Sequence, residues 1–133
     1  MARYATALAG NPAATYRAVD LGSRAAASDG HGLVGLLYDE LLGALRTAAW
    51  AAENNAMQLK SERVTRALAI LFALEAGLDF ERGGDMARTL GRLYLGARGE
   101  LVSASLGTDP APFRALASHL GEVAGAWASV RRS

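Results

Sequence analysis

From about residue 30 onward, apolar residues recur at the three- and four-residue spacing of amphipathic α-helices. The first stripe ends near Asn54-Asn55 and comprises Leu33, Val34, Leu37, Tyr38, Leu41, Leu42 and Leu45. A second stripe begins at about Ser61 or slightly earlier and comprises Val64, Ala67, Leu68, Leu71, Leu74 and Leu78. This second helix is expected to end near Gly83-Gly84, because paired glycines adopt left-handed geometry at little cost.

Two further helices are expected after the glycine pair. Asp85 is placed to accept a hydrogen bond from the free N–H groups of the third helix, which should stop at Leu106-Gly107. Its apolar positions are Met86, Leu90, Leu93, Ala97, Leu101 and Ala104. Asp109-Pro110 predicts the next start, since an acidic N-cap and a proline at the first helical position both favour one. The fourth stripe, Phe113, Leu116, Leu120, Val123, Trp127 and Val130, has the spacing of a bundle seam.

Four amphipathic helices joined by short connections favour an all-α, antiparallel four-helix bundle over residues 30–133, with helices crossing at about 20°. Residues 1–29 lack such a stripe and contain the breaker Gly10-Asn11-Pro12. We expect them to form a mobile N-terminal arm with a short capping helix. Alanine and leucine dominate while β-branched residues are scarce, so composition agrees with an all-helical fold.

Composition also narrows the classes of function. The 133 residues carry a formal net charge of +1, which provides no strong field for nucleic acid or an anionic membrane. No cysteine is present, which excludes a disulfide framework and a Cys nucleophile and suits a reducing compartment. No apolar run approaches the roughly 20 residues of a membrane span. We therefore expect a cytoplasmic protein without nucleic-acid binding or membrane insertion.

Few residues of the chain suggest a catalytic or metal-binding site. His119 and Glu122 lie three residues apart on the fourth helix and are the nearest approach to a bundle metal site. A di-iron site needs two Glu-x-x-His pairs and two more glutamates, whereas this chain offers one pair in reversed order, so a solvated polar face is favoured over a metal site. The same helix carries a face of small residues, Ala117, Gly121, Ala124, Gly125 and Ala128. That face either packs closely on another helix of the bundle or lines a groove for a helix from another protein.

Three short runs, in this order, carry a family resemblance. They are GLVGLLYDE at residues 32–40, LDFERGGD at residues 78–85 and LGRLY at residues 90–94, followed by a closing Trp127. Their order and spacing over residues 28–130 resemble the FliS family of flagellar secretion chaperones. The resemblance implies a helical, non-enzymatic and ATP-independent chaperone that needs no cofactor or metal. Its implied task is to bind the C-terminal segment of flagellin, prevent premature polymerisation and aid type III export.

The resemblance also implies partners and contact residues. Flagellin is the expected client, with the flagellar export apparatus or a co-chaperone as a further partner, and the chain is expected to be a monomer or a weak dimer. Tyr16 is the arm tyrosine expected to cover part of the apolar surface when no client is bound. The expected contacts, taken from the matching motifs and from apolar positions one turn away, are Tyr16, Leu33, Leu37, Tyr38, Leu41, Leu71, Leu90 and Tyr94. The alternatives are a bundle metalloprotein and a homodimeric helical interaction module.

Overall fold

The structure, a computed structural model, describes residues 30–132 as consecutive α-helices without a strand in that range. The helices are α3 (Gly30–Glu53), α4 (Met57–Ala76), α5 (Phe80–Ser105) and α6 (Ala111–Arg132). Residues 1–29 and Ser133 lie outside the described part, so the arm, its short helix and Tyr16 remain predictions.

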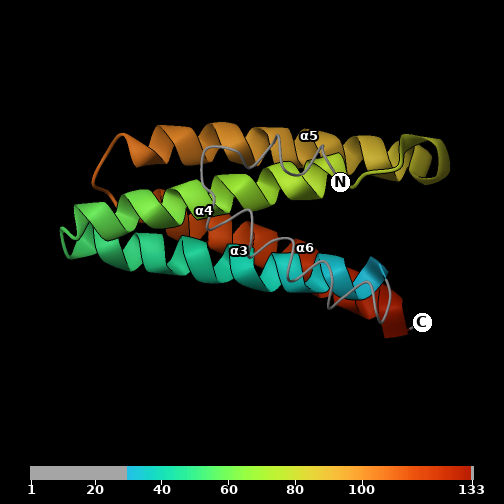
Figure 1. Cartoon of the computed structure of the whole chain (residues 1–133), viewed down its shortest axis with the longest axis horizontal. Coiled ribbons are helices and arrows are strands. Elements are labelled where there is room, and N and C mark those ends of the chain that lie inside the picture. The colour runs from blue at the N-terminus through green and yellow to red at the C-terminus, as the bar shows by residue number, and fades with distance from the viewer. Residues whose placement is uncertain (1–29, 133) are drawn as a thin grey trace.

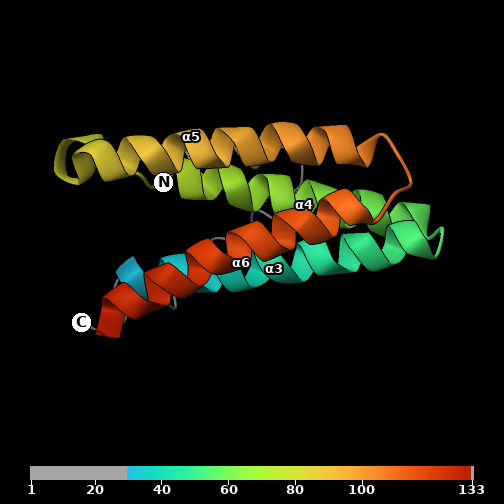
Figure 2. The same ribbon diagram turned by 180° about the vertical axis from the view of Figure 1, so that it is seen from behind.

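The helices form two layers, with α5 beside α4 and α6 beside α3 (Figure 1). Contacts between α3 and α4 join the layers, whereas α5 and α6 touch less than any other neighbouring pair. Figure 1 and the reverse view in Figure 2 both show α5 and α6 approaching each other at their connection and diverging toward the opposite end. The predicted antiparallel four-helix bundle is therefore confirmed, with one side more open than the other three.

The core is built from the predicted stripes. Its largest fully buried side chains are Tyr38, Leu41, Leu45, Leu71, Tyr94, Leu101, Phe113 and Leu120. Full burial of each leucine or phenylalanine stabilises the fold by about 1.5–3 kcal/mol. Two predicted stripe residues differ, because Met86 and Val130 are mostly exposed. Val130 lies in the last turns of α6, where this helix has diverged from α5.

The boundary between the second and third helices differs from the one predicted from the sequence. The expected break at Gly83-Gly84 is not where α4 ends, because α4 stops at Ala76 and the connection is residues 77–79. The Asp79 carboxylate, rather than that of Asp85, accepts hydrogen bonds from the N–H groups of Glu81 and Arg82, each at 3.1 Å. These bonds satisfy the free donors at the start of α5, so a helical turn forms before the glycines are reached.

Gly84 nevertheless bends the chain, inside α5 rather than between helices. Its φ of 51° and ψ of −126° are non-helical, and they lie in a region that residues with a Cβ rarely adopt. A Cβ on the preceding Gly83 would lie 2.8 Å from the Cβ of Ala87, which is too close for unaltered packing. The glycine pair therefore turns the first residues of α5 relative to the rest of that helix.

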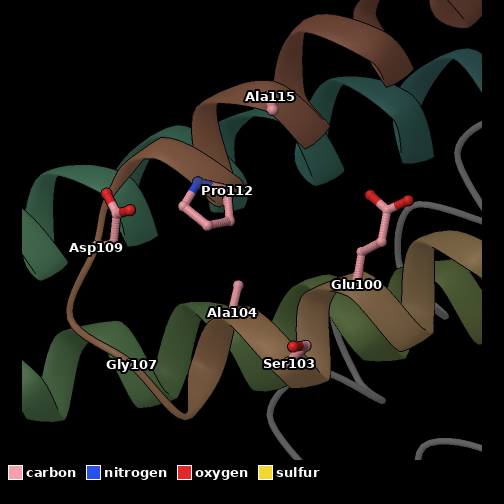
Figure 3. Close-up of a pocket in the computed structure, with 7 residues that line it drawn as sticks. All are labelled: Glu100, Ser103, Ala104, Gly107, Asp109, Pro112 and Ala115. Atoms are coloured by element: carbon pink, nitrogen blue, oxygen red, sulfur yellow. The ribbon is translucent and has the colours of Figure 1, made fainter.

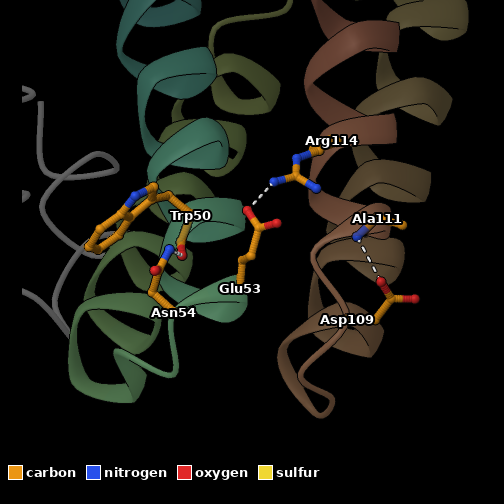
Figure 4. Close-up of polar contacts among 6 residues, drawn as sticks. All are labelled: Trp50, Glu53, Asn54, Asp109, Ala111 and Arg114. Carbon is orange, nitrogen blue, oxygen red and sulfur yellow. Dashed lines mark hydrogen bonds and ion pairs between the residues drawn. The ribbon is translucent and has the colours of Figure 1, made fainter.

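The connection between α5 and α6 is held by polar contacts. Lys60, the one lysine of the chain, is buried and donates from Nζ to the carbonyl oxygens of Ser105 (3.1 Å) and Gly107 (2.7 Å). The Asp109 carboxylate accepts from the N–H of Ala111 at 2.9 Å, so an acidic residue does cap α6 (Figure 4). Pro110, which the sequence placed at the first helical position, lies one residue before the start of α6 at Ala111.

We expect opposite effects from two Gly→Ala substitutions. Gly84→Ala should lower the free energy of unfolding by about 1–3 kcal/mol, because alanine is strained at this φ and ψ. Gly43→Ala is the matched control, since Gly43 is exposed within α3 and an added Cβ would meet nothing within 4 Å. That control should raise stability by about 0.5–1 kcal/mol. Urea unfolding followed by circular dichroism measures both, and equal effects would contradict a special backbone at Gly84.

Candidate functional site

An apolar cavity of about 400 Å³ lies at the end of the bundle where α3 begins and α4 ends. All four helices contribute to it, since α6 supplies Trp127. We call it the apolar cavity, and its larger side chains are Leu33, Val34, Leu37, Leu74, Leu78, Met86, Leu90, Tyr94 and Trp127. Asp79 is the one charged residue in its wall. A concave, mainly apolar site with few polar groups is typical of a binding site.

Tyr94 lines the inner wall of the apolar cavity and joins it to the core. The Tyr94 hydroxyl lies 2.5 Å from that of Tyr38, and each tyrosine is at most 2% exposed. A buried hydroxyl needs a partner to offset its lost hydration, and each tyrosine provides one for the other.

Burial also changes the acidity of this pair. Loss of hydration on burial raises the pKa of the Tyr94 hydroxyl well above its ordinary value, and the hydrogen bond and charge of Tyr38 raise it further. Burial raises the pKa of Tyr38 as well, against the opposing effect of its hydrogen bond with Tyr94. Both hydroxyls therefore stay protonated at neutral pH, and the pair has a structural rather than an acid–base role.

A contact between the two ends of the described chain closes one side of the cavity. The rings of His31 and Trp127 stack with centroids 4.3 Å apart and planes 13° from parallel. The Trp127 indole Nε1 donates to the His31 carbonyl oxygen at 3.2 Å, and His31 Nε2 lies 3.0 Å from the Trp127 carbonyl oxygen. These contacts fix the later part of α6 against the first turn of α3.

The outer edge of this region carries exposed apolar side chains. Met86 is 68% exposed and Phe80 is 51% exposed, and the two flank the bend at Gly84. The Phe80 ring lies close to Gly91, where an added Cβ would be 3.6 Å from its Cε1. Large apolar residues left in water beside an apolar hollow are characteristic of interaction sites.

The expected contact residues fall into three groups. Leu33, Leu37, Leu90 and Tyr94 are brought together in the wall of the apolar cavity. Tyr38, Leu41 and Leu71 are instead buried in the core and do not line it. Tyr16 lies outside the described residues. The leucine stripe of α3 is wide enough to serve both core and cavity, so helical spacing alone does not separate the two groups.

Sequence reasoning missed several residues of this site. Leu74, Leu78 and Trp127 line the cavity, but the sequence analysis named them as stripe or motif residues and not as contact residues. Met86 was assigned to the third helical stripe and Phe80 appeared only within the motif at residues 78–85, although the two flank the glycine pair and a flexible methionine suits an adaptable binding surface. Two large apolar residues around a Gly-Gly bend are the signal that could have identified them.

The structure also bears on the small-residue face of α6, on metal binding and on membrane spans. On the small-residue face of α6, Ala117 is buried, whereas Gly125 and Ala128 are exposed. A Cβ on Gly121 or Gly125 would meet nothing within 4 Å, so close packing does not extend along the whole face. Within residues 30–132, no three His, Asp or Glu side chains are grouped so that they could hold a metal ion. Over the same residues, no helix combines the length and the apolarity that crossing a membrane requires.

Comparison with known proteins gives one consistent result. The sequence profile of the family described as flagellar protein FliS matches residues 12–133. The flagellar secretion chaperone FliS of Salmonella typhimurium is 30% identical over 116 residues, which cover 86% of each chain. That of Vibrio cholerae is 28% identical over 112 residues, covering 84% of this chain and 82% of the relative. Flagellar secretion chaperone FliSB of Pseudomonas aeruginosa is 30% identical over 112 residues, covering 84% and 89%.

The tyrosine pair should show strong non-additivity in a double-mutant cycle. Tyr38→Phe or Tyr94→Phe alone leaves one hydroxyl buried without its partner, which should cost about 1–3 kcal/mol. The double variant removes both hydroxyls and should lose clearly less than the sum of the single losses. Urea unfolding of the four proteins measures this difference, and additive losses would show that the hydroxyls do not depend on each other.

The same pair should make the protein sensitive to alkali. Because the folded pKa of each tyrosine is raised, their contribution is fully present below the unfolded pKa of about 10 and is lost as pH rises above it. We expect the free energy of unfolding to fall more steeply between about pH 10 and 12 in the wild type than in the Tyr38→Phe, Tyr94→Phe double variant. Unfolding curves across this range provide the test, and parallel pH profiles would contradict it.

Proposed function

This chain belongs to the FliS family of flagellar proteins, and on that premise we propose that it is a flagellar secretion chaperone for flagellin. It binds the C-terminal segment of flagellin through the apolar cavity and its exposed edge. By covering that segment in the cytoplasm it prevents premature polymerisation and keeps the client competent for the export apparatus. The mechanism is masking by binding, without a catalytic step.

The observation that carries the proposal is the apolar cavity with the exposed Met86 and Phe80 beside it. A client segment that is disordered when free loses conformational entropy on binding, so it needs extensive apolar burial in return. The cavity offers this without rearrangement of the core, because Tyr94 and the Tyr38 behind it are fixed by their hydrogen bond. A preformed wall lowers the ordering cost on the chaperone side.

Contacts within the site support particular residues for this role. Leu33, Leu37 and Leu90 present side chains to the cavity from α3 and α5. Leu37 is nearly fully buried, so Leu33 and Leu90, which are only partly buried, are the better candidates for direct contact. Tyr38, Leu41 and Leu71 act indirectly, because they support the wall from the core.

A methionine pair provides a matched test. Met86→Asp places a charge at the edge of the apolar cavity, where a bound client would bury it, and should weaken binding of full-length flagellin at least about tenfold. Met57→Asp makes the same change at the start of α4, the end of that helix away from the apolar cavity. The Met57 side chain is 39% exposed there, and the substitution should leave the affinity unchanged. Calorimetric titration gives the affinities, and circular dichroism shows that both variants remain folded.

Flagellin that lacks its C-terminal segment is the client control and should not bind the wild-type chain. Equal binding of intact and truncated flagellin would place recognition elsewhere on the client. Equal affinities of the two Asp variants would place it elsewhere on this protein.

A further inference from the structure

A second hollow lies between α5 and α6, near their connection and away from the apolar cavity. It measures about 360 Å³, and Figure 3 shows Glu100 and Ala104 on the α5 side facing Pro112 and Ala115 on the α6 side. We call it the acidic furrow, and it is lined by Glu100, Ser103, Ala104, Gly107, Asp109, Pro112 and Ala115. Its walls are small side chains and two carboxylates, whereas the walls of the apolar cavity are large and hydrophobic.

The two hollows lie along the same side of α5. Leu90 lines the apolar cavity, and Leu93, Ala97, Glu100 and Ala104 follow it at steps of three and four residues. Residues spaced in this way share one face of a helix, so this face runs from one hollow to the other. This face is directed toward α6, the neighbouring helix that α5 contacts less closely than it contacts α4. Open space beside α5 is also evident at Gly96, where an added Cβ would meet nothing within 4 Å.

The charged side chains that line the acidic furrow are all negative. Glu100 is exposed and forms no ion pair with any residue of the described part. Of the cations at this end of the bundle, Arg114 pairs with Glu53 at 2.6 Å (Figure 4), and the Lys60 ammonium is buried behind Gly107, so the charge that the furrow presents to solvent is that of its carboxylates. On α6, Glu122 lies on the same helix face as Pro112, Ala115 and the exposed His119, since these positions also follow at three- and four-residue steps. The furrow therefore complements a positive charge carried by a partner.

We propose that the client segment held in the apolar cavity continues along the open side between α5 and α6 and places an Arg or Lys side chain in the acidic furrow. This inference rests on the proposed function and adds a charge requirement and a direction to it. The basic side chain lies between Glu100 and Asp109, while small apolar residues of the client pack against Ala104, Pro112 and Ala115. One side of the bundle then recognises an apolar anchor at one end and a positive charge at the other.

The geometry fixes a spacing in the client. Ten residues of α5 separate Leu90 from Glu100, which is about 15 Å at the helical rise of 1.5 Å per residue. A helical client therefore carries its basic residue about ten positions from its apolar anchor. An extended client spans the same distance in about five residues. Substituting each Arg and Lys of the flagellin C-terminal segment in turn identifies which of them occupies the furrow.

Charge reversal tests the inference in the full-length chain. Glu100→Lys should weaken binding of the flagellin C-terminal segment about tenfold at low ionic strength, and the loss should shrink in high salt. Glu100 lies in the last two turns of α5, where a positive charge is compatible with the helix dipole, so the fold is retained. Glu62→Lys on α4 is the matched control, because Glu62 is also exposed and lies away from both hollows. It should leave the affinity within about twofold of the wild type.

Charge reversal in the client completes the test. Replacing one basic client residue with Glu should also weaken binding to the wild-type chain, and combining it with Glu100→Lys should restore most of the affinity. If Glu100→Lys binds the client as tightly as the wild type does, or if no charge reversal in the client rescues binding, the role of the acidic furrow is overturned. The proposed function still stands in that case if Met86→Asp weakens binding. A wild-type chain that does not bind the segment at all overturns both. Light scattering that shows dimerisation of the free chain, abolished by Glu100→Lys, assigns the furrow to a second copy and likewise overturns the inference.

Discussion

The hydrogen bond between Tyr38 and Tyr94 links helices that otherwise sit diagonally across the bundle. The main packing contacts of α3 are with α4 and α6, and those of α5 are with α4. A slip of either helix along its axis would separate two hydroxyls that are buried from solvent, at a cost greater than that of losing an exposed contact. The bond therefore fixes the register of α3 relative to α5. The inner wall of the apolar cavity depends on that register, because Tyr94 is part of it.

With α5 held against α4 and α3, the bundle does not need close contact between α5 and α6. Near the connection between α5 and α6, Lys60 of α4 holds the last residue of α5 and the start of the connecting loop, because it donates to the carbonyl oxygens of Ser105 and Gly107. At the opposite end α6 is fixed to α3 by the His31–Trp127 contact instead. At this end α6 is therefore held to α3 rather than to α5, which accounts for the divergence of α5 and α6. It leaves apolar surface available that a regular four-helix bundle would bury in its own core.

The two hollows on this open side differ in their chemistry. The apolar cavity is walled by leucines, Tyr94 and Trp127, and favours only the removal of apolar surface from water. The furrow near Glu100 and Asp109 has small walls and negative charge, so it discriminates by charge and adds little apolar burial. A surface that combines both features favours one orientation of a bound segment. An apolar groove of uniform composition would accept either direction.

Hydrophobic spacing alone determined that the chain folds as four antiparallel helices, and the order of three short motifs indicated the FliS family. It placed the end of the second helix wrongly at Gly83-Gly84 with Asp85 as the next cap, because the outcome depends on which carboxylate captures the free N–H groups of α5, and Asp79 does so. The leucine stripe of α3 likewise named Leu33, Leu37 and Leu41 together, although only the first two reach the apolar cavity. A helix shows its apolar residues in its sequence, but which of them face a neighbouring helix and which face a hollow depends on how the helices diverge. That divergence is set by contacts between residues far apart in the chain, such as His31 with Trp127 and Tyr38 with Tyr94, and only the tertiary structure brings them together.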